Sequence, residues 1–232
     1  MESPVKENRV AIILPALNEA LTIGRVLDEM PKPALEQDGY QVEIVVVDSN
    51  SNDETAQIAR DKGARILVEP RRGKAIAVRT ALASIEADFV FLLDADYTYP
   101  ATYIPEMLRI LRSGCPVVIG SRLRGWREKG AIRRLNLVGN ILLTRLANIL
   151  YGTRISDLCT GYWGMRREVI PELELRASGF QLEAELLTQL AKKGYAIAEV
   201  PIFYRRRPSK AKINRIRDGV RIAWLLVSRR FK

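Results

Sequence analysis

The chain has 232 residues, of which 47% are hydrophobic and 28% are charged, and its formal net charge is +10. This composition predicts a folded domain with a substantial core and excludes a disordered chain. Histidine is absent, which excludes a serine–histidine triad, a histidine general base and a histidine-ligated zinc site. No stretch is long enough to cross a bilayer, and we expect Cys115 and Cys159 to be reduced thiols.

Buried strands alternate with helices over the first 120 residues. Strands are predicted at residues 10–14, 42–47, 65–68, 89–93 and 116–119, and the first two are apolar runs typical of fully buried strands. Helical patterns lie between them, at residues 18–30, 53–62 and 73–87 and from residue 100 onward. This alternation predicts an α/β fold with a doubly wound, mostly parallel sheet, in which ligands bind at the carboxyl ends of the strands.

The second half of the chain has a different pattern. A long helix is predicted over residues 131–151, a loop over 152–164, an amphipathic helix over 181–193 and a strand over 197–204. The last segment is a basic amphipathic helix. We therefore expect one large domain over residues 1–210 and a C-terminal helix over 211–232.

Two acidic segments follow predicted strands. Asp94 and Asp96, two residues apart at a strand end, are able to converge on Mg²⁺ or Mn²⁺, which in turn binds a diphosphate. The alternative is that Asp96 caps the next helix. In the segment from Asp48 to Asp53, we expect Asp48 to contact a ligand and Asp53 to be a helix N-cap.

Two further segments lie at predicted helix starts. Asn18 and Glu19 follow the first strand, where an N-cap and a favourable interaction with the helix dipole explain them without a ligand. Arg72 and Lys74 flank Gly73 at a helix N-terminus, which is a potential anion site. The spacing is not that of a P-loop, and no GxGxxG motif indicates a dinucleotide-binding dehydrogenase.

Eight segments in order resemble the family 2 glycosyltransferases, and among them the dolichyl-phosphate mannose synthase-like branch. The segments are LPALNEA, VVVDSNSNDET, RRGKA, LLDADYTYP, GSR, DLCTGYWGMRRE, FQLEAELL and EVPIFYRRRPSK. The resemblance implies a GT-A fold and inverting, metal-dependent transfer of a hexose from a nucleotide-sugar. It assigns the following residues to the nucleotide-sugar pocket, with Mn²⁺ or Mg²⁺ bound by the last two: Pro15, Leu17, Glu19, Asp48, Arg72, Lys74, Arg207, Lys210, Asp94 and Asp96.

The resemblance also implies an acceptor side. Arg122 would meet a phosphate of the donor or the acceptor, and Asp157 and Gly161 would shape the sugar and acceptor site. Asp96, Arg122 and Asp157 are the catalytic candidates. An alcohol acceptor would need a general base, for which Asp157 is the candidate, whereas an ionised phosphate would not. The other role considered for Asp157 is a hydrogen bond to the loop around Thr160.

The chain departs from the family pattern at three places. Ser49 replaces the usual second acidic residue after Asp48, and Thr98 stands where this branch often has glutamine. The loop before Ser209 is shortened. These departures concern the third protein ligand of the metal and the identity of the sugar.

The helix over 131–151 begins with Arg133 and Arg134 and is then apolar, whereas the C-terminal helix interleaves basic and apolar residues. This pattern is typical of helices at a membrane interface, where each cation contributes about 1 kcal/mol on anionic lipid. The alternative is core packing with a solvated basic face. We therefore expect a nucleotide-sugar donor, a polyprenyl-phosphate acceptor and an anionic membrane surface as partners. The expected location is the cytoplasmic face of a membrane, as a peripheral protein or as part of an anchored one.

Three activities fit this sequence. The first is transfer of mannose from GDP-mannose to a polyprenyl or dolichyl phosphate. The second is transfer of glucose from UDP-glucose to such a lipid, and the third is a soluble family 2 transferase with a saccharide or small-molecule acceptor. Nucleic acid is not an expected partner, because the acidic strand ends would repel a polyanion and the basic tail carries no recognition motif.

Overall fold

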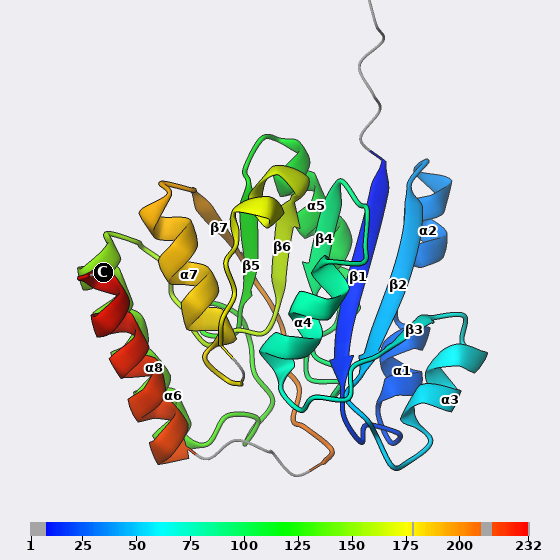
Figure 1. Cartoon of the computed structure of the whole chain (residues 1–232), viewed down its shortest axis with the longest axis horizontal. Coiled ribbons are helices and arrows are strands. Elements are labelled where there is room, and N and C mark those ends of the chain that lie inside the picture. The colour runs from blue at the N-terminus through cyan, green and yellow to red at the C-terminus, as the bar shows by residue number, and fades with distance from the viewer. Residues whose placement is uncertain (1–7, 178, 210–214, 232) are drawn as a thin grey trace, which may run out of the picture.

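The computed structural model describes residues 8–177, 179–209 and 215–231. Its centre is a seven-stranded sheet in the order β3-β2-β1-β4-β6-β5-β7 (Figure 1). The strands are β1 (Arg9–Ala16), β2 (Gln41–Asp48), β3 (Arg65–Val68), β4 (Phe89–Leu92), β5 (Val117–Ser121), β6 (Trp163–Arg166) and β7 (Ile197–Pro201). The neighbouring pairs are parallel except where β6 takes part, so the predicted α/β class with a mostly parallel sheet is confirmed.

Strand β6 is the strand of the sheet that the sequence did not predict. It lies antiparallel between β4 and β5, in a segment expected to be largely loop. The strand is only four residues long, and it contains Gly164 and Arg166 in place of an apolar run. A side chain at Gly164 would come within 2.8 Å of Phe91 and Val118, so the close packing of three strands requires glycine at this position.

Helices cover both faces of the sheet. One core contains apolar side chains of α1, α2, α3 and α5, and the other contains those of α4, α6, α7 and α8. The helices are α1 (Ile23–Asp28), α2 (Lys32–Gln37), α3 (Thr55–Asp61), α4 (Lys74–Leu82), η1 (Ala101–Tyr103), α5 (Ile104–Arg112), α6 (Arg134–Tyr151), η2 (Arg167–Glu172), α7 (Leu182–Lys192) and α8 (Arg215–Arg230). None of these described helices combines the length and apolarity that crossing a membrane requires.

The first helix is shorter than predicted, because its expected start is occupied by a turn. Asn18 has a φ of 51°, which is outside the right-handed helical region. The backbone amides of Asn18 and Glu19 donate to the hydroxyl groups of Ser51 and Thr55, so they are held by the turn after β2. Further along, the prolines at 31 and 33 do not merely end a helix, since they stand at the start of α2.

The C-terminal helix packs against the domain. Arg229 donates to the buried carboxylate of Glu185 on α7 at 2.6 Å, and the hydroxyl of Tyr151 on α6 donates to the carbonyl of Leu226 at 2.7 Å. Leu225 and Leu226 are buried in the second core. Figure 1 shows α8 beside α6 at one end of the molecule.

Candidate active site

Lys74 joins two carboxylates at the carboxyl edge of the sheet. It is the first residue of α4, and its Nζ lies 2.5 Å from Asp94, which follows β4. The same nitrogen donates to Glu183 on α7 at 2.8 Å. Burial alone would lower the pKa of Lys74, but the charges of Asp94 and Glu183 outweigh it and raise the pKa above its usual value. Lys74 is therefore a permanent cation in this site.

Arg207 joins a second pair of carboxylates. Its Nη2 donates to Glu19 after β1 at 2.5 Å, and its Nη1 lies 3.2 Å from Asp96 after β4. Thr98 donates to Asp96 from both its amide and its hydroxyl, at 3.1 and 2.6 Å. Burial, together with the charge of Asp94, raises the pKa of Asp96 although Arg207 opposes the change. These contacts bring together Glu19, Asp96 and Arg207, which the family resemblance had assigned to the nucleotide-sugar pocket.

The described residues of this cluster carry a net negative charge. The four carboxylates of Glu19, Asp94, Asp96 and Glu183 face the two cations Lys74 and Arg207, which leaves two negative charges. Carboxylate oxygens are the preferred ligands of Mg²⁺ and Mn²⁺. The donor set and its charge are thus suited to a divalent cation.

Gly161 allows the backbone to approach this cluster closely. A Cβ atom at this position would lie 2.5 Å from Asp94 Oδ2 and 2.9 Å from Lys74 Nζ, so only glycine fits without displacing them. The amide of Gly161 donates to the hydroxyl of buried Tyr99 at 2.8 Å. The expectation that Gly161 shapes the site is consistent with this close approach.

Arg122 and Asp157 form a buried ion pair near Tyr99. Arg122 Nε and Nη2 donate to the two oxygens of Asp157 at 2.8 and 2.7 Å, and the Arg122 amide adds a third bond at 3.0 Å. The Arg122 guanidinium lies over the ring of Tyr204, with 5.2 Å between Cζ and the ring centroid. Such a bidentate pair fixes the orientation of the guanidinium.

The contacts of Asp157 favour a positioning role over that of the general base predicted from the sequence. Burial raises the pKa of Asp157, but the charge and hydrogen bonds of Arg122 and the amide of Asn140 reverse the effect and hold the pKa below its usual range. A carboxylate with a lowered pKa is a weak base. Its partners are Arg122 and Asn140, so the alternative hydrogen bond to the loop around Thr160 is not the contact observed.

Pro15, Leu17 and Asp48 lie where β1 and β2 end, whereas Arg72 lies between β3 and α4. Asp48 is buried, and both its oxygens accept weakly from the amide of Ser51, at 3.2 and 3.3 Å. Pro15 and Leu17 are partly buried beside it, whereas Arg72 is exposed. Asp53 accepts from the amide and hydroxyl of Thr55 at the start of α3, close to the capping role expected for it. Lys210 lies outside the described residues.

Comparison with protein families identifies the chain. The model described as "Glycosyl transferase family 2" matches residues 11–173. The chain belongs to this family. The resemblance inferred from the sequence motifs is therefore confirmed, and so is the fold it implied.

Two relatives of this family 2 chain are named as sugar transferases of dolichyl or dolichol phosphate. The "Dolichyl-phosphate hexose transferase" of Haloferax volcanii is 37% identical over 220 residues, which cover 94% of this chain and 92% of the relative. The "Dolichol-phosphate mannosyltransferase" of Pyrococcus furiosus is 28% identical over 213 residues, and the match covers 84% of this chain but 56% of the relative.

A solved structure of similar fold contains a metal and a nucleotide. Glucosyl-3-phosphoglycerate synthase from Mycobacterium tuberculosis, in complex with Mn²⁺, UDP and glucosyl-3-phosphoglycerate, has a TM-score of 0.77 and 25% sequence identity to this family 2 chain. The match covers 96% of this chain and 80% of that structure.

Three residues of the site received no role from the sequence. Glu183 pairs with Lys74, Tyr99 accepts from Gly161, and Asn140 donates to Asp157. Glu183 and Tyr99 lie within motifs that carried the family resemblance, and membership of those motifs could have pointed to them as site residues. Asn140 lies in a helix whose apolar spacing indicated only an amphipathic surface, so no local pattern pointed to it.

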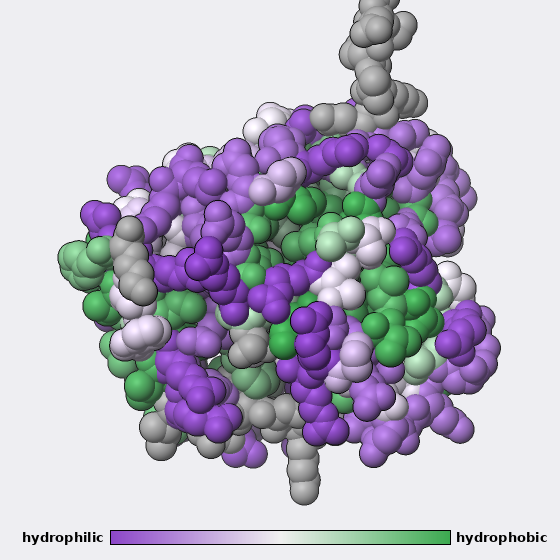
Figure 2. Space-filling view, viewed as in Figure 1, coloured by the Kyte–Doolittle hydropathy of each residue, from purple (hydrophilic) through white to green (hydrophobic). Residues whose placement is uncertain are grey.

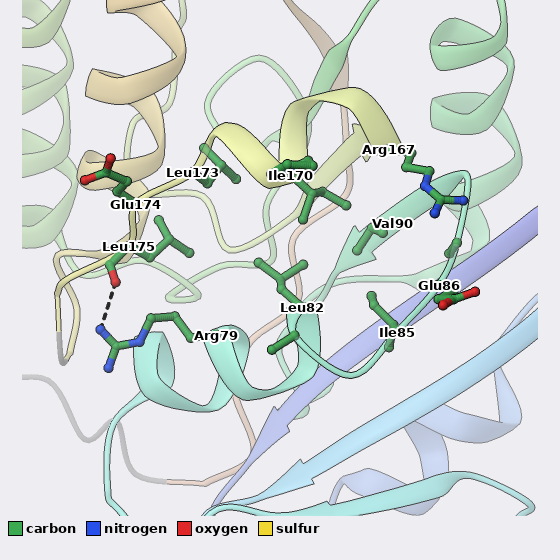
Figure 3. A pocket seen from close by; sticks show the side chains of 13 residues that line it. Arg79, Leu82, Ile85, Glu86, Val90, Arg167, Ile170, Leu173, Glu174 and Leu175 are labelled. Atoms are coloured by element: carbon green, nitrogen blue, oxygen red, sulfur yellow. Dashed lines mark hydrogen bonds between the residues drawn. The ribbon is translucent and has the colours of Figure 1, made fainter.

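A separate cavity of about 520 Å³ lies at the opposite end of β4 (Figure 3). Its walls combine apolar side chains, including Leu82, Val90 and Ile170, with charged ones. The charged lining residues are Arg79, Glu86, Arg167 and Glu174. Among the predicted site residues that the structure describes, none lines it. It therefore belongs to a different part of the molecule from the carboxylate cluster.

Proposed function

We propose that this family 2 glycosyltransferase transfers a hexose from a nucleotide-sugar to a polyprenyl phosphate at a membrane surface, with inversion at the anomeric carbon. Mannose from GDP-mannose is the preferred donor. The observation that carries the proposal is the carboxylate cluster at the carboxyl edge of the sheet, in a chain that matches a dolichyl-phosphate hexose transferase over nearly its whole length.

The donor would bind over this cluster. Asp94 and Asp96 would hold Mn²⁺ or Mg²⁺, which supplies positive charge to the leaving diphosphate. No group of three or more His, Cys, Asp or Glu residues in the described ranges is arranged to bind a metal by itself, so the diphosphate would complete the ligand set. Arg207 and Lys74 already provide fixed cations beside the two aspartates, and preorganised charge of this kind stabilises a leaving anion. Lys210 is expected to assist them.

The acceptor phosphate would attack the anomeric carbon directly. Its oxygen forms the new bond to the sugar, the bond to the nucleoside diphosphate breaks, and the diphosphate leaves with the bonding electrons. An ionised phosphate needs no general base, in agreement with the lowered pKa of Asp157. Arg122, held by Asp157, would supply the positive charge that orients the acceptor phosphate.

Helices α6 and α8 support the membrane part of the proposal. Their exposed large apolar residues are Leu135, Val138, Leu142, Ile149, Val220, Trp224 and Val227, and Phe231 follows α8 directly. Figure 2 shows hydrophobic residues along the edge of the molecule formed by α8. Exposed arginines of these two helices are at positions 134, 145, 217, 221 and 230. Apolar side chains among cations suit a bilayer with anionic headgroups, and we propose the cytoplasmic face as its location.

UDP-glucose is the alternative donor. It is favoured by the structural neighbour, whose complex contains UDP, Mn²⁺ and a glucosylated product. The carboxylate cluster and Arg207 would contact the sugar diphosphate, which both donors share. Discrimination would therefore depend on the base pocket around Asp48.

A thermal-shift panel tests the proposal. GDP-mannose, UDP-glucose and UDP-N-acetylglucosamine are each added with and without Mn²⁺, and we expect one nucleotide-sugar to raise the melting temperature only when the metal is present. Asp96→Ala should abolish this shift. Asp61→Ala is the matched control, because within the described residues the Asp61 side chain accepts a hydrogen bond only from Gln57, at the protein surface. No stabilisation by any donor, in folded protein, would refute the enzyme assignment.

A further inference from the structure

Helix α6 has two faces of opposite character. Leu135, Val138, Leu142 and Ile149 are exposed and belong to the apolar surface described above. The buried residues of the helix are Asn140, Thr144 and Ala147, and two of these three are polar. A buried polar side chain is costly unless it is hydrogen-bonded, so the partners of Asn140 are informative.

Asn140 uses both its donor and its acceptor. Its Nδ2 donates to Asp157 Oδ1 at 2.6 Å, and its Oδ1 accepts from the amide of Cys159 at 3.3 Å. Thr144, one turn later, donates to the same Oδ1 at 3.3 Å and accepts from the amide of Leu158 at 3.0 Å. Helix α6 is thereby tied to the loop that carries Asp157.

Asp157 also binds Arg122, so it links Asn140 to Arg122. Asp157 Oδ1 accepts from Asn140 and from Arg122 Nη2, so the amide and the guanidinium share one oxygen. We propose that Asn140 is a positioning residue that holds Arg122 in its productive orientation through Asp157. This inference rests on the proposed function, in which Arg122 meets the acceptor phosphate. In the proposed function, the outer face of α6 contacts the membrane and Arg122 meets the lipid phosphate. Asn140, on the inner face of α6, would thus link the membrane-contacting helix to Arg122.

The chemistry at position 140 requires a donor. Asp157 is ionised and accepts hydrogen bonds. Only a side chain at position 140 with an N–H or O–H can therefore donate to its carboxylate. The titratable groups around this contact are Arg122, Cys159, Tyr99 and Tyr204. Burial raises the pKa of Cys159 to about 12, and burial also raises the pKa of both tyrosines, so these three remain neutral. The buried carboxylates on helices α7 and α8, which pack against α6, are Glu183, Glu185 and Asp218.

Asn140→Asp is the informative variant. When the new carboxyl group is protonated, its O–H can donate to Asp157 as the amide does. When it is ionised, two carboxylates repel each other and Arg122 is drawn from its position. Because burial and the charge of Asp157 both disfavour ionisation, its pKa is raised. We therefore expect activity near the wild-type level at low pH and a loss of about tenfold or more as the pH rises, because small displacements of an orienting group slow transfer.

Asn148→Asp is the matched control. It makes the same change two turns later in α6, where the Asn148 amide donates to the carbonyl of Ile155 at 2.8 Å, away from Arg122. Hexose transfer to polyprenyl phosphate in vesicles is measured from pH 5.5 to 9 for the wild type and both variants. A new descending limb in kcat for Asn140→Asp alone, with the donor KM unchanged, supports the proposal. Parallel profiles for the wild type and Asn140→Asp would overturn it.

A second measurement is independent of activity. The Nε–H of Arg122 donates to Asp157, so its NMR signal should be protected from solvent exchange, and Arg122→Lys identifies the signal by its loss. In Asn140→Asp this protection should fall as the pH rises, but in Asn148→Asp it should not. Unchanged protection in Asn140→Asp would overturn the inference even if the wild type transfers no hexose. Absence of transfer by the wild type counts only against the proposed function.

Discussion

Gly161→Ala is predicted to separate catalysis from folding. The added Cβ would lie 2.5 Å from Asp94 Oδ2, whereas ordinary contact begins at 3.4 Å, so the carboxylate has to move by about 0.9 Å. The nearest atoms belong to the side chains of Asp94 and Lys74, which can shift without moving the backbone. A displacement of about 1 Å in a site of this kind costs about 100-fold in rate.

The assay is the initial rate of hexose transfer with saturating Mn²⁺, together with thermal melting. We expect a rate about 100-fold below that of the wild type and a melting temperature changed by only a few degrees. Gly139→Ala is the control, because a Cβ at this position in α6 meets nothing within 4 Å and alanine favours a helix by about 0.5–1 kcal/mol. A rate for Gly161→Ala within about threefold of the wild type would refute the reasoning, since a 100-fold loss is the expected cost of such a displacement.

Three other perturbations test the site and the surface. Asp157→Asn should lower the free energy of unfolding by about 3–5 kcal/mol at pH 7, because buried Arg122 loses its partner. The pKa of Asp157 is lowered in the folded protein. The stabilisation by the Asp157 carboxylate is therefore present above the usual pKa near 3.9 and is lost as the pH falls through the folded-state pKa. In denaturant unfolding, the difference between Asp157→Asn and the wild type should shrink below about pH 4. Chelation by EDTA should stop transfer and added Mn²⁺ should restore it, and full activity in the chelator would remove the metal from the mechanism. Trp224 is 68% exposed on α8, and Trp224→Ser should reduce flotation with anionic vesicles about tenfold. Val68 is 67% exposed on β3, and the control Val68→Ser should not reduce flotation. Equal binding by both variants would exclude α8 as the membrane contact.

The sequence by itself determined the sheet and the edge at which the site lies. Apolar runs identified five strands, of which β1, β2, β4 and β5 are largely buried, because a parallel strand covered on both faces has no polar side to alternate with. Asp94 and Asp96 were recognisable because they follow such a run directly. Local order along the chain was sufficient for these features.

Only the tertiary structure decided which groups meet. Strand β6 is defined by neighbours on both sides, and its own four residues carry no signal. Glu183 reaches Lys74 across 109 positions of sequence, and Asn140 faces Asp157 because one side of α6 packs on the domain. Apolar periodicity along α6 predicted an amphipathic helix but not which apolar residues face the domain. Leu143, Leu146 and Leu150 pack on the core, Leu135, Val138, Leu142 and Ile149 are exposed, and the buried residues include two polar side chains. Contacts between distant segments depend on how the elements pack, and no local pattern records that packing.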